Sequence, residues 1–181
     1  MKKLTSIITI TFIFTMFLSS NLLAQKFSDL DKSPMDAASF PTDYKVSAKV
    51  VKIIYSRPQL KGRSLSELAP NGKVWRTGAN EAAEITFYAD LNFGKTLIKA
   101  GTYTLYTIPG EKEWTVIINK DLNVWGSYFY KQDNDVARLT VPVTGDKDSI
   151  EAFSMVFSEA DKNIILTMGW DKVRIAVPFT K

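Results

Sequence analysis

Apolar and polar residues alternate along most of the chain after residue 43, with the two-residue period of half-buried β-strands. The alternating segments span residues 44–56, 85–89, 96–99, 103–107, 114–118, 136–143, 153–157, 164–170 and 173–179. No segment shows the 3.6-residue apolar period of a substantial helix. The pattern predicts an all-β fold of eight or nine antiparallel strands in one domain. Its architecture would be a β-sandwich or flattened barrel of jelly-roll or Greek-key type.

The first alternating segment, 44–56, changes phase in its middle. Apolar residues occupy even positions up to Val50 and odd positions from Val51 onward, which predicts a β-bulge near Val50–Val51. Turn residues at 92–94, 109–112, 145–148, 161–163 and 171–172 separate the later strands, and segments 103–107 and 114–118 are predicted to form a hairpin. Pro142 indicates an edge strand or the end of a strand.

A long connection interrupts this pattern after residue 56. Ser64 and Glu67 have the spacing of a capping box, which predicts one helical turn over residues 64–68. The stretch from Lys73 to Glu84 then combines a tryptophan, an arginine, an asparagine and two carboxylates without a regular period. Loops of this length are uncommon in compact domains and are often functional. Irregular stretches in otherwise regular chains also often mark binding sites.

The N-terminus has the features of an export signal. It begins with two lysines after Met1, continues with an apolar run from Leu4 to Leu18, and reaches a small residue, Ala24, before a polar one. These features predict a signal peptide at residues 1–24, cleavage after Ala24, and a periplasmic or secreted location. The alternative is an uncleaved membrane anchor, which the short, threonine-containing run disfavours.

Removal of the signal peptide would leave 157 residues, enough for one domain with its own core. Residues 25–43 are polar and contain Pro34 and Pro41, so we predict a flexible N-terminal leader there, followed by the β-sandwich domain at 44–181. The aspartates in the leader would also suit a calcium site, but a solvated linker is the favoured interpretation.

The chain contains no histidine and no cysteine. Their absence excludes Ser-His-Asp and Cys-His catalysis, disulfides, and zinc, copper, haem or iron–sulfur sites with such ligands. There is also no glycine-rich phosphate loop. Any proton transfer would therefore depend on Asp, Glu, Lys or Tyr. We expect no cofactor and no metal.

The formal net charge is +4, of which Lys2 and Lys3 contribute two, so the mature chain would carry +2. This weak basic balance, without a run of lysines and arginines interleaved with aromatic residues, argues against a nucleic-acid partner. We also expect no membrane span after signal cleavage. The sequence does not identify a protein partner.

Several motifs resemble those of a known family. They are Tyr55-Ser56-Arg57-Pro58, Lys61-Gly62-Arg63, the stretch Lys73 to Glu81, Ala100 to Tyr103, Ile108-Pro109-Gly110, Trp114-Thr115-Val116, Trp125-Gly126 and the strand with Trp170. In these motifs the chain resembles the family catalogued as domain of unknown function 2911, which comprises secreted bacterial envelope proteins. The resemblance covers nearly the whole mature chain, and the string Trp-Arg-Thr-Gly-Ala-Asn-Glu is specific. It implies a secreted single-domain protein and implies no activity.

The long connection supplies the candidate ligand-binding residues. They are Arg57, Lys61, Arg63, Trp75, Arg76, Asn80 and Glu81. We expect the connection to fold over one end of the sandwich, so that Trp75 offers a flat apolar face among polar side chains. Such a surface suits a sugar ring or a small anion. Gly78 would allow a positive φ or a close backbone approach.

A structural interpretation of the same residues is favoured over binding. In it, Arg57 or Arg76 pairs with Glu81 to satisfy a buried loop, while Trp75 plugs the open end of the core. A catalytic interpretation would use Glu81 and Glu84 as acid and base. It is the least favoured, because a strand would direct two side chains three positions apart to opposite faces.

Other aromatic and acidic residues have simpler interpretations. Trp114 and Trp170 lie in alternating segments and are predicted core residues. Trp125, with Tyr128 and Tyr130, is either a second aromatic surface or, the favoured reading, the means by which a loop is pinned to the sandwich. Residues 133–135 (Asp-Asn-Asp) lack the spacing and glycine of a calcium loop and are predicted to form a turn.

Two functional hypotheses follow. The first is an exported, non-catalytic envelope binding or accessory module with a small-molecule or glycan ligand at the 57–84 loop. The alternative is a histidine-free hydrolase or lyase that depends on carboxylates or on Lys61.

Overall fold

The computed structural model of the protein describes residues 26–181, and residues 32–181 form one structural unit. The predicted signal peptide at 1–24 lies outside the described residues. The elements are β1 (Met35–Phe40), β2 (Val51–Ser56), α2 (Leu65–Leu68), β3 (Ala83–Phe87), β4 (Leu91–Phe93), β5 (Thr96–Ile98), β6 (Gly101–Ile108), β7 (Glu113–Asn119), a 3₁₀ turn (Gln132–Asn134), β8 (Asp135–Ala160) and β9 (Asn163–Thr180).

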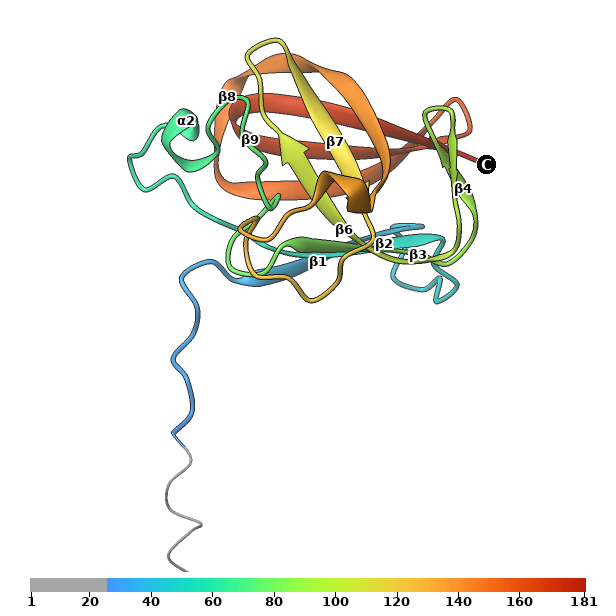
Figure 1. Ribbon diagram of the computed structural model, residues 1–181, viewed down its shortest axis with the longest axis horizontal. Helices are drawn as coiled ribbons and strands as arrows, with labels where there is room; N and C mark the ends of the chain where they lie inside the picture. The colour runs from blue at the N-terminus through green and yellow to red at the C-terminus, as the bar shows by residue number, and fades with distance from the viewer. Residues whose placement is uncertain (1–25) are drawn as a thin grey trace, which may run out of the picture. The chain divides into compact units, whose positions relative to one another are not determined.

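The nine strands form one antiparallel sheet in the order β1-β2-β3-β6-β7-β8-β9-β4-β5. The sheet folds over on itself without closing, so that β1, β2 and β3 lie below the C-terminal parts of β8 and β9 in Figure 1. This arrangement confirms the predicted all-β fold, a sandwich or flattened barrel. The predicted hairpin is formed by β6 and β7, in which Leu105 pairs with Ile118.

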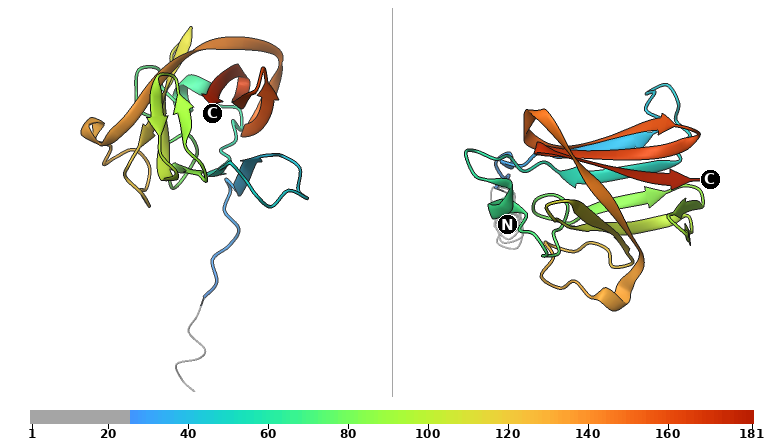
Figure 2. Two further views of the ribbon diagram at one scale, coloured as in Figure 1. Left: turned by 90° about the vertical axis from the view of Figure 1, so that its right-hand side faces the viewer. Right: turned by 90° about the horizontal axis from the view of Figure 1, so that it is seen from above.

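Strand β8 connects the two layers because it changes partner along its length. Its first part, up to Pro142, pairs with β7, and from Val143 onward it pairs with β9. Figure 2 shows the curved course of this strand across the molecule. Pro142 stands opposite Glu113 at the last position of the β7 ladder. The prediction that it marks an edge strand or the end of a strand is wrong, because β8 continues through it to Ala160 and only the pairing partner changes there.

The turns predicted at 145–148 and 171–172 are wrong, because both segments are irregularities within β8 and β9. The β8–β9 register shifts between Gly145 and Ile150 and again before Ser154, and Asp171 has a φ of 47°. The Arg174 guanidinium compensates for the interrupted ladder by donating to the carbonyl oxygens of Asp171 and Asp148, each at 2.7 Å. The polar residues at 145–148 and 171–172 therefore mark an interruption of the β8–β9 ladder, which the Arg174 side chain bridges with its hydrogen bonds.

The N-terminal part of the domain differs from the prediction in two ways. Within the predicted leader at 25–43, Met35–Phe40 forms β1, which pairs with β2 along its whole length. The predicted strand over 44–56 begins only at Val51, so the change of phase near Val50–Val51 marks the start of a strand and not a bulge. Residues 41–50 form a loop in which the Lys49 ammonium donates to the carbonyl oxygen of Pro41 at 2.6 Å.

The main core lies between the two layers. Side chains that alternate along the strands meet there, including Ile53, Ile85, Val116, Phe157, Leu166 and Phe179, each nearly fully buried. The segment after β2 ties the layers together at one side, because the Leu60 amide donates to the Glu151 carbonyl at 3.0 Å. The helical turn predicted at 64–68 is confirmed as α2, with the Ser64–Glu67 capping box present.

Candidate functional site

Trp75, the predicted aromatic face, lies in the core. Its side chain is 6% exposed. The indole stacks on Trp170, with ring centroids 5.4 Å apart, and contacts Phe153 edge-on at 5.0 Å. Trp75 is therefore a buried core residue and not the solvent-facing aromatic surface that the binding interpretation expected.

The basic residues at the start of the connection make structural contacts. The Arg57 guanidinium lies 3.1 Å from the Asp36 carboxylate and donates to Ser154 Oγ at 2.6 Å. Arg63 donates to the carbonyl oxygens of its own loop at 2.9 and 3.0 Å. The Lys61 side chain is exposed, while its backbone amide donates to the Glu151 carboxylate at 2.7 Å. These three residues do not converge on one point.

Arg76 and Glu81 do not form the ion pair that the structural interpretation expected, nor does Arg57 pair with Glu81. Arg76 is half-buried, and its Nε atom is buried without a hydrogen-bond partner among the described residues. Burial lowers the pKa of its guanidinium. Asn80 has a φ of 60°, and its backbone oxygen accepts from the Gly126 amide at 3.0 Å. Glu81 is exposed.

Gly78 lies where the irregular stretch passes β2. A Cβ atom at this position would stand 3.1 Å from the backbone oxygen of Ser56. The close approach expected for this glycine is therefore present, and its role is to let two backbone segments pack together. It brings the residues that follow, 79–84, beside the end of β2.

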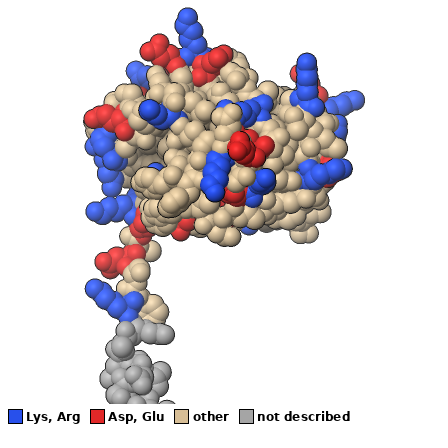
Figure 3. Space-filling view, in the orientation of Figure 1, with Lys and Arg blue, Asp and Glu red and all other residues tan. Residues whose placement is uncertain are grey.

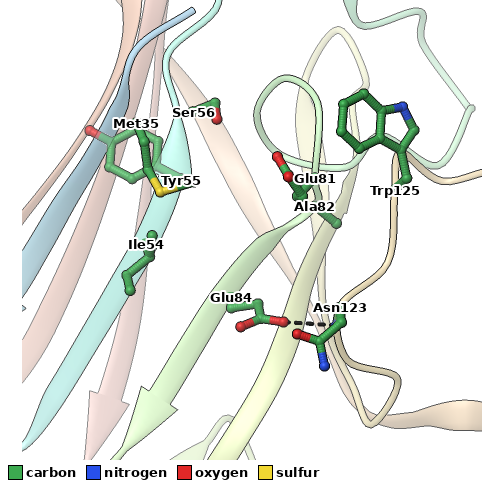
Figure 4. Close-up of a pocket in the computed structure, with 9 residues that line it drawn as sticks. All are labelled: Met35, Ile54, Tyr55, Ser56, Glu81, Ala82, Glu84, Asn123 and Trp125. Atoms are coloured by element: carbon green, nitrogen blue, oxygen red, sulfur yellow. Dashed lines mark hydrogen bonds between the residues drawn. The ribbon is translucent and has the colours of Figure 1, made fainter. Parts of the chain in front are cut away.

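A cavity of about 370 Å³ opens at this place, beside β2 and the beginning of β3 (Figure 4). It is lined by Met35, Ile54, Tyr55, Ser56, Glu81, Ala82, Glu84, Asn123 and Trp125. Of the seven predicted site residues, only Glu81 belongs to this lining. The other lining residues come from β1, β2, β3 and the segment after β7, which the fold brings together from distant parts of the sequence.

Two carboxylates face this cavity. The Glu84 carboxylate accepts a hydrogen bond from the backbone amide of Asn123 at 2.9 Å, which is drawn as a dashed line in Figure 4. Glu81 has no side-chain hydrogen bond, and neither carboxylate forms an ion pair within residues 26–181. Glu81 and Glu84 belong to the same lining although they are three positions apart, and Glu81 precedes β3, where the chain is not yet a regular strand. Both carboxylates are hydrogen-bond acceptors.

Trp125 contributes an apolar side chain to the same lining, next to Glu81, with which it forms an isolated β-bridge. Its side chain is 57% exposed, so one of the chain's four tryptophans presents its ring to solvent at the cavity. The backbone around it is fixed by hydrogen bonds from the Ala82 amide to Val124 and from the Gly126 amide to Asn80, both 3.0 Å. Gly126 is required there, because its φ of +67° is unfavourable for other residues and the Tyr128 ring covers it.

Tyr130 anchors the far end of the same segment. Its hydroxyl donates to the Asp135 carboxylate at 2.6 Å and accepts from the Arg138 guanidinium. Burial, followed by the interaction with Asp135, raises the pKa of Tyr130 to about 12. Each of the two interpretations of this segment holds for part of it. Tyr130 pins the loop, whereas Trp125 and Tyr128 are exposed and form an aromatic surface.

The sequence analysis missed Met35, Ile54, Tyr55, Ser56, Ala82 and Asn123 as lining residues. Ile54 carried a weak signal, because it is apolar at an outward position of β2, between buried Ile53 and Tyr55. The motif Trp125-Gly126 was a stronger signal. Met35 could not be found, because the strand that holds it was predicted as leader.

Three further findings concern acidic clusters, helices and surface charge in the described chain. Within residues 26–181 there is no group of three or more acidic side chains that could hold a metal ion. In the same range no helix has the length and apolar character needed to cross a bilayer. On the face shown in Figure 3, basic and acidic side chains are interspersed.

Comparison with known proteins gives one match. The family model described as "Protein of unknown function (DUF2911)" matches residues 33–179. No curated protein and no solved structure matches the chain.

Proposed function

We propose that this chain, which belongs to the DUF2911 family of proteins of unknown function, is a non-catalytic binding module for a neutral sugar ring. The ligand would occupy the cavity that Trp125, Glu81 and Glu84 help to line. We further propose, from the predicted signal peptide, that the module acts in the cell envelope or outside the cell.

The observation that carries this proposal is the pairing of an exposed indole with two carboxylates that have no cationic partner among residues 26–181. A sugar ring has an apolar face that packs on an aromatic ring, and hydroxyl groups at its edge that donate to carboxylates. The volume of about 370 Å³ falls in the range of small-ligand sites. The anion considered from the sequence is disfavoured, because two carboxylates would repel it and Arg76 is not part of the lining.

One feature of the cavity supports the alternative hypothesis, a histidine-free hydrolase or lyase, and another argues against it. Glu81 and Glu84 line the same cavity, as an acid–base pair would have to. Lys61, the other candidate, is absent from the lining. The binding module remains the better proposal, and turnover is one of the outcomes that the experiment separates.

The test uses the fluorescence of Trp125, because Trp75, Trp114 and Trp170 are at most 6% exposed and provide a constant background. A panel of neutral monosaccharides and disaccharides is titrated into the protein, with cationic amines and small anions as comparison ligands. We expect a saturable change with a sugar. Calorimetry on Glu81→Gln and Glu84→Gln should show at least about tenfold weaker binding, the cost of losing one good hydrogen bond to a charged group.

The matched control is Glu159→Gln, which changes an exposed carboxylate at the end of β8 outside the cavity. It should bind as the wild type does. Absence of any saturable sugar binding would overturn the proposal, and so would unchanged affinity in both cavity variants. Release of product from a glycoside, lost in Glu84→Gln, would favour the hydrolase instead.

A further inference from the structure

The loop between β7 and β8 exposes an unusual amount of apolar surface. We call residues 121–131 the aromatic loop. From Leu122 to Tyr130 it has no charged residue. The exposed fractions of its large apolar side chains are 43% for Leu122, 57% for Trp125, 77% for Tyr128 and 76% for Phe129. Single exposed apolar residues are normal, but several on one short loop indicate an interaction site.

The aromatic loop is held in place by the rest of the domain. The Ser127 hydroxyl donates to the Val74 carbonyl at 2.9 Å, and the Gly126 amide donates to Asn80 at 3.0 Å. The buried ring of Tyr106 packs edge-on against Tyr130, with centroids 5.2 Å apart. The backbone of the loop is thus anchored at its middle and at its end. Its exposed side chains are presented by an ordered backbone, so a partner would bind them with little ordering cost.

The chemistry of these side chains fits the interface of a lipid bilayer. Trp and Tyr favour the boundary between headgroups and acyl chains, where one part of the ring is dry and the polar atom stays wet. Phe and Leu favour the apolar side of that boundary. Phe129 in particular has no polar atom that could hydrogen-bond to a hydrophilic ligand.

Two lysines flank the aromatic loop. Lys120 and Lys131 stand at its two ends, and both are exposed without an ion pair in the described part of the chain. Of the neighbouring acids, Asp135 pairs with Arg138 at 2.7 Å and the Asp121 carboxylate accepts from Asn134 at 2.6 Å, whereas Asp133 is exposed. The two lysine ammonium groups can therefore meet lipid phosphates.

We propose that the aromatic loop is a peripheral membrane anchor, which inserts Tyr128, Phe129 and Leu122 into the interface of a bilayer that contains anionic phospholipids. The proposal does not rest on sugar binding. It has a consequence for the cavity, because Trp125 belongs both to the aromatic loop and to the cavity wall. A ligand in the cavity would lie beside the membrane surface.

The test measures binding to vesicles by co-sedimentation. Vesicles of phosphatidylcholine alone are compared with vesicles of equal parts phosphatidylcholine and phosphatidylglycerol. We expect the wild type to bind the anionic vesicles, with a blue shift of Trp125 emission. The double variant Tyr128→Ser/Phe129→Ser should bind at least about tenfold more weakly, because each lost apolar contact reduces the partition coefficient. Lys120→Gln/Lys131→Gln should reduce the preference for anionic vesicles.

Tyr88→Ser is the matched control, since Tyr88 is 55% exposed outside the aromatic loop and should not affect vesicle binding. The double variant leaves all residues that line the sugar cavity unchanged, and Glu84→Gln leaves all residues of the aromatic loop unchanged. Failure of one proposal therefore does not imply failure of the other. The membrane proposal is overturned if the wild type binds neither type of vesicle or if the double variant binds like the wild type. Self-association that the double variant abolishes, without vesicle binding, would identify a protein interface instead.

Discussion

The indole rings of Trp75 and Trp170 stack inside the core, with centroids 5.4 Å apart and an interplanar angle of 17°. Trp114 meets Trp75 edge-on at 6.1 Å. The backbone of Trp75 also pairs with Thr107 through hydrogen bonds of 2.7 and 3.0 Å. Trp75 thus fixes the start of the irregular stretch inside the core, and the residues that line the cavity follow a few positions later at the surface.

Replacement of Trp75 by alanine should lower the free energy of unfolding by about 3–5 kcal/mol, the usual cost of removing a large buried aromatic side chain. Urea denaturation followed by circular dichroism measures the change. Trp75→Phe keeps part of the ring stacking and should cost less. A loss below about 1 kcal/mol in the alanine variant would contradict the central position of this residue, since such a loss is typical of a surface site.

Arg57 connects β1 to β8, and its substitution should weaken this connection while the pairing of β1 with β2 remains. It donates to the Phe153 carbonyl at 3.0 Å as well as to Ser154 and Asp36. Arg57→Met should lower the free energy of unfolding by about 1–3 kcal/mol, because buried acceptors lose a charged donor. Asp36→Asn removes only a partly exposed ion pair and should cost less than about 1 kcal/mol. The reverse order in thermal denaturation would show that the ion pair is the main contact.

The alternation of apolar residues predicted most of the strands, because each of them has one face on the core. It failed at β1, whose six residues Met35–Phe40 have no strong alternation and are held mainly by backbone pairing with β2. It also failed where Arg174 bridges an interrupted ladder, since a side chain that replaces ladder hydrogen bonds leaves no periodic signal. The local pattern of apolar residues thus identified the buried face of each strand, but not the length of the strands or their order in the sheet.

The candidate site was harder to predict for a related reason. The residues chosen from one irregular stretch separate in space: Trp75 turns inward, Arg57 turns to β8, and only Glu81 reaches the cavity. The cavity depends on β1, β2 and β3 lying next to each other and on a loop that follows β7. A single sequence does not specify that neighbourhood. The motif around Trp125 was visible, but its exposure depends on the anchoring of the aromatic loop.

The titration of tyrosine should show two groups of residues. The pKa values of Tyr106 and Tyr130 are raised to about 12, in both cases mainly by burial. The folded state therefore favours their protonated forms relative to the unfolded chain, whose tyrosines titrate near pH 10. Their contribution to stability is complete below pH 10 and is lost as the pH rises from about 10 to about 12.

Tyrosinate absorbance measured against pH checks this expectation. A late phase near pH 12 should lose amplitude in Tyr130→Phe and also in Tyr106→Phe. Titration of all tyrosines in one step near pH 10 would contradict the burial of Tyr106 and Tyr130.

Substitution of Arg76 should reveal whether its guanidinium costs stability. It is half-buried, it has no ion pair among the described residues, and its Nε atom has no hydrogen-bond partner. Burial of a charge without a partner is unfavourable, and an apolar side chain of similar length removes that cost. Arg76→Met should therefore leave the free energy of unfolding unchanged or raise it by about 1 kcal/mol.

The matched control is Arg63→Met, which removes donors to two carbonyl oxygens and should lower the free energy of unfolding by about 1 kcal/mol. If Arg76→Met is the more destabilising of the two in urea denaturation, the guanidinium has a stabilising role in the fold.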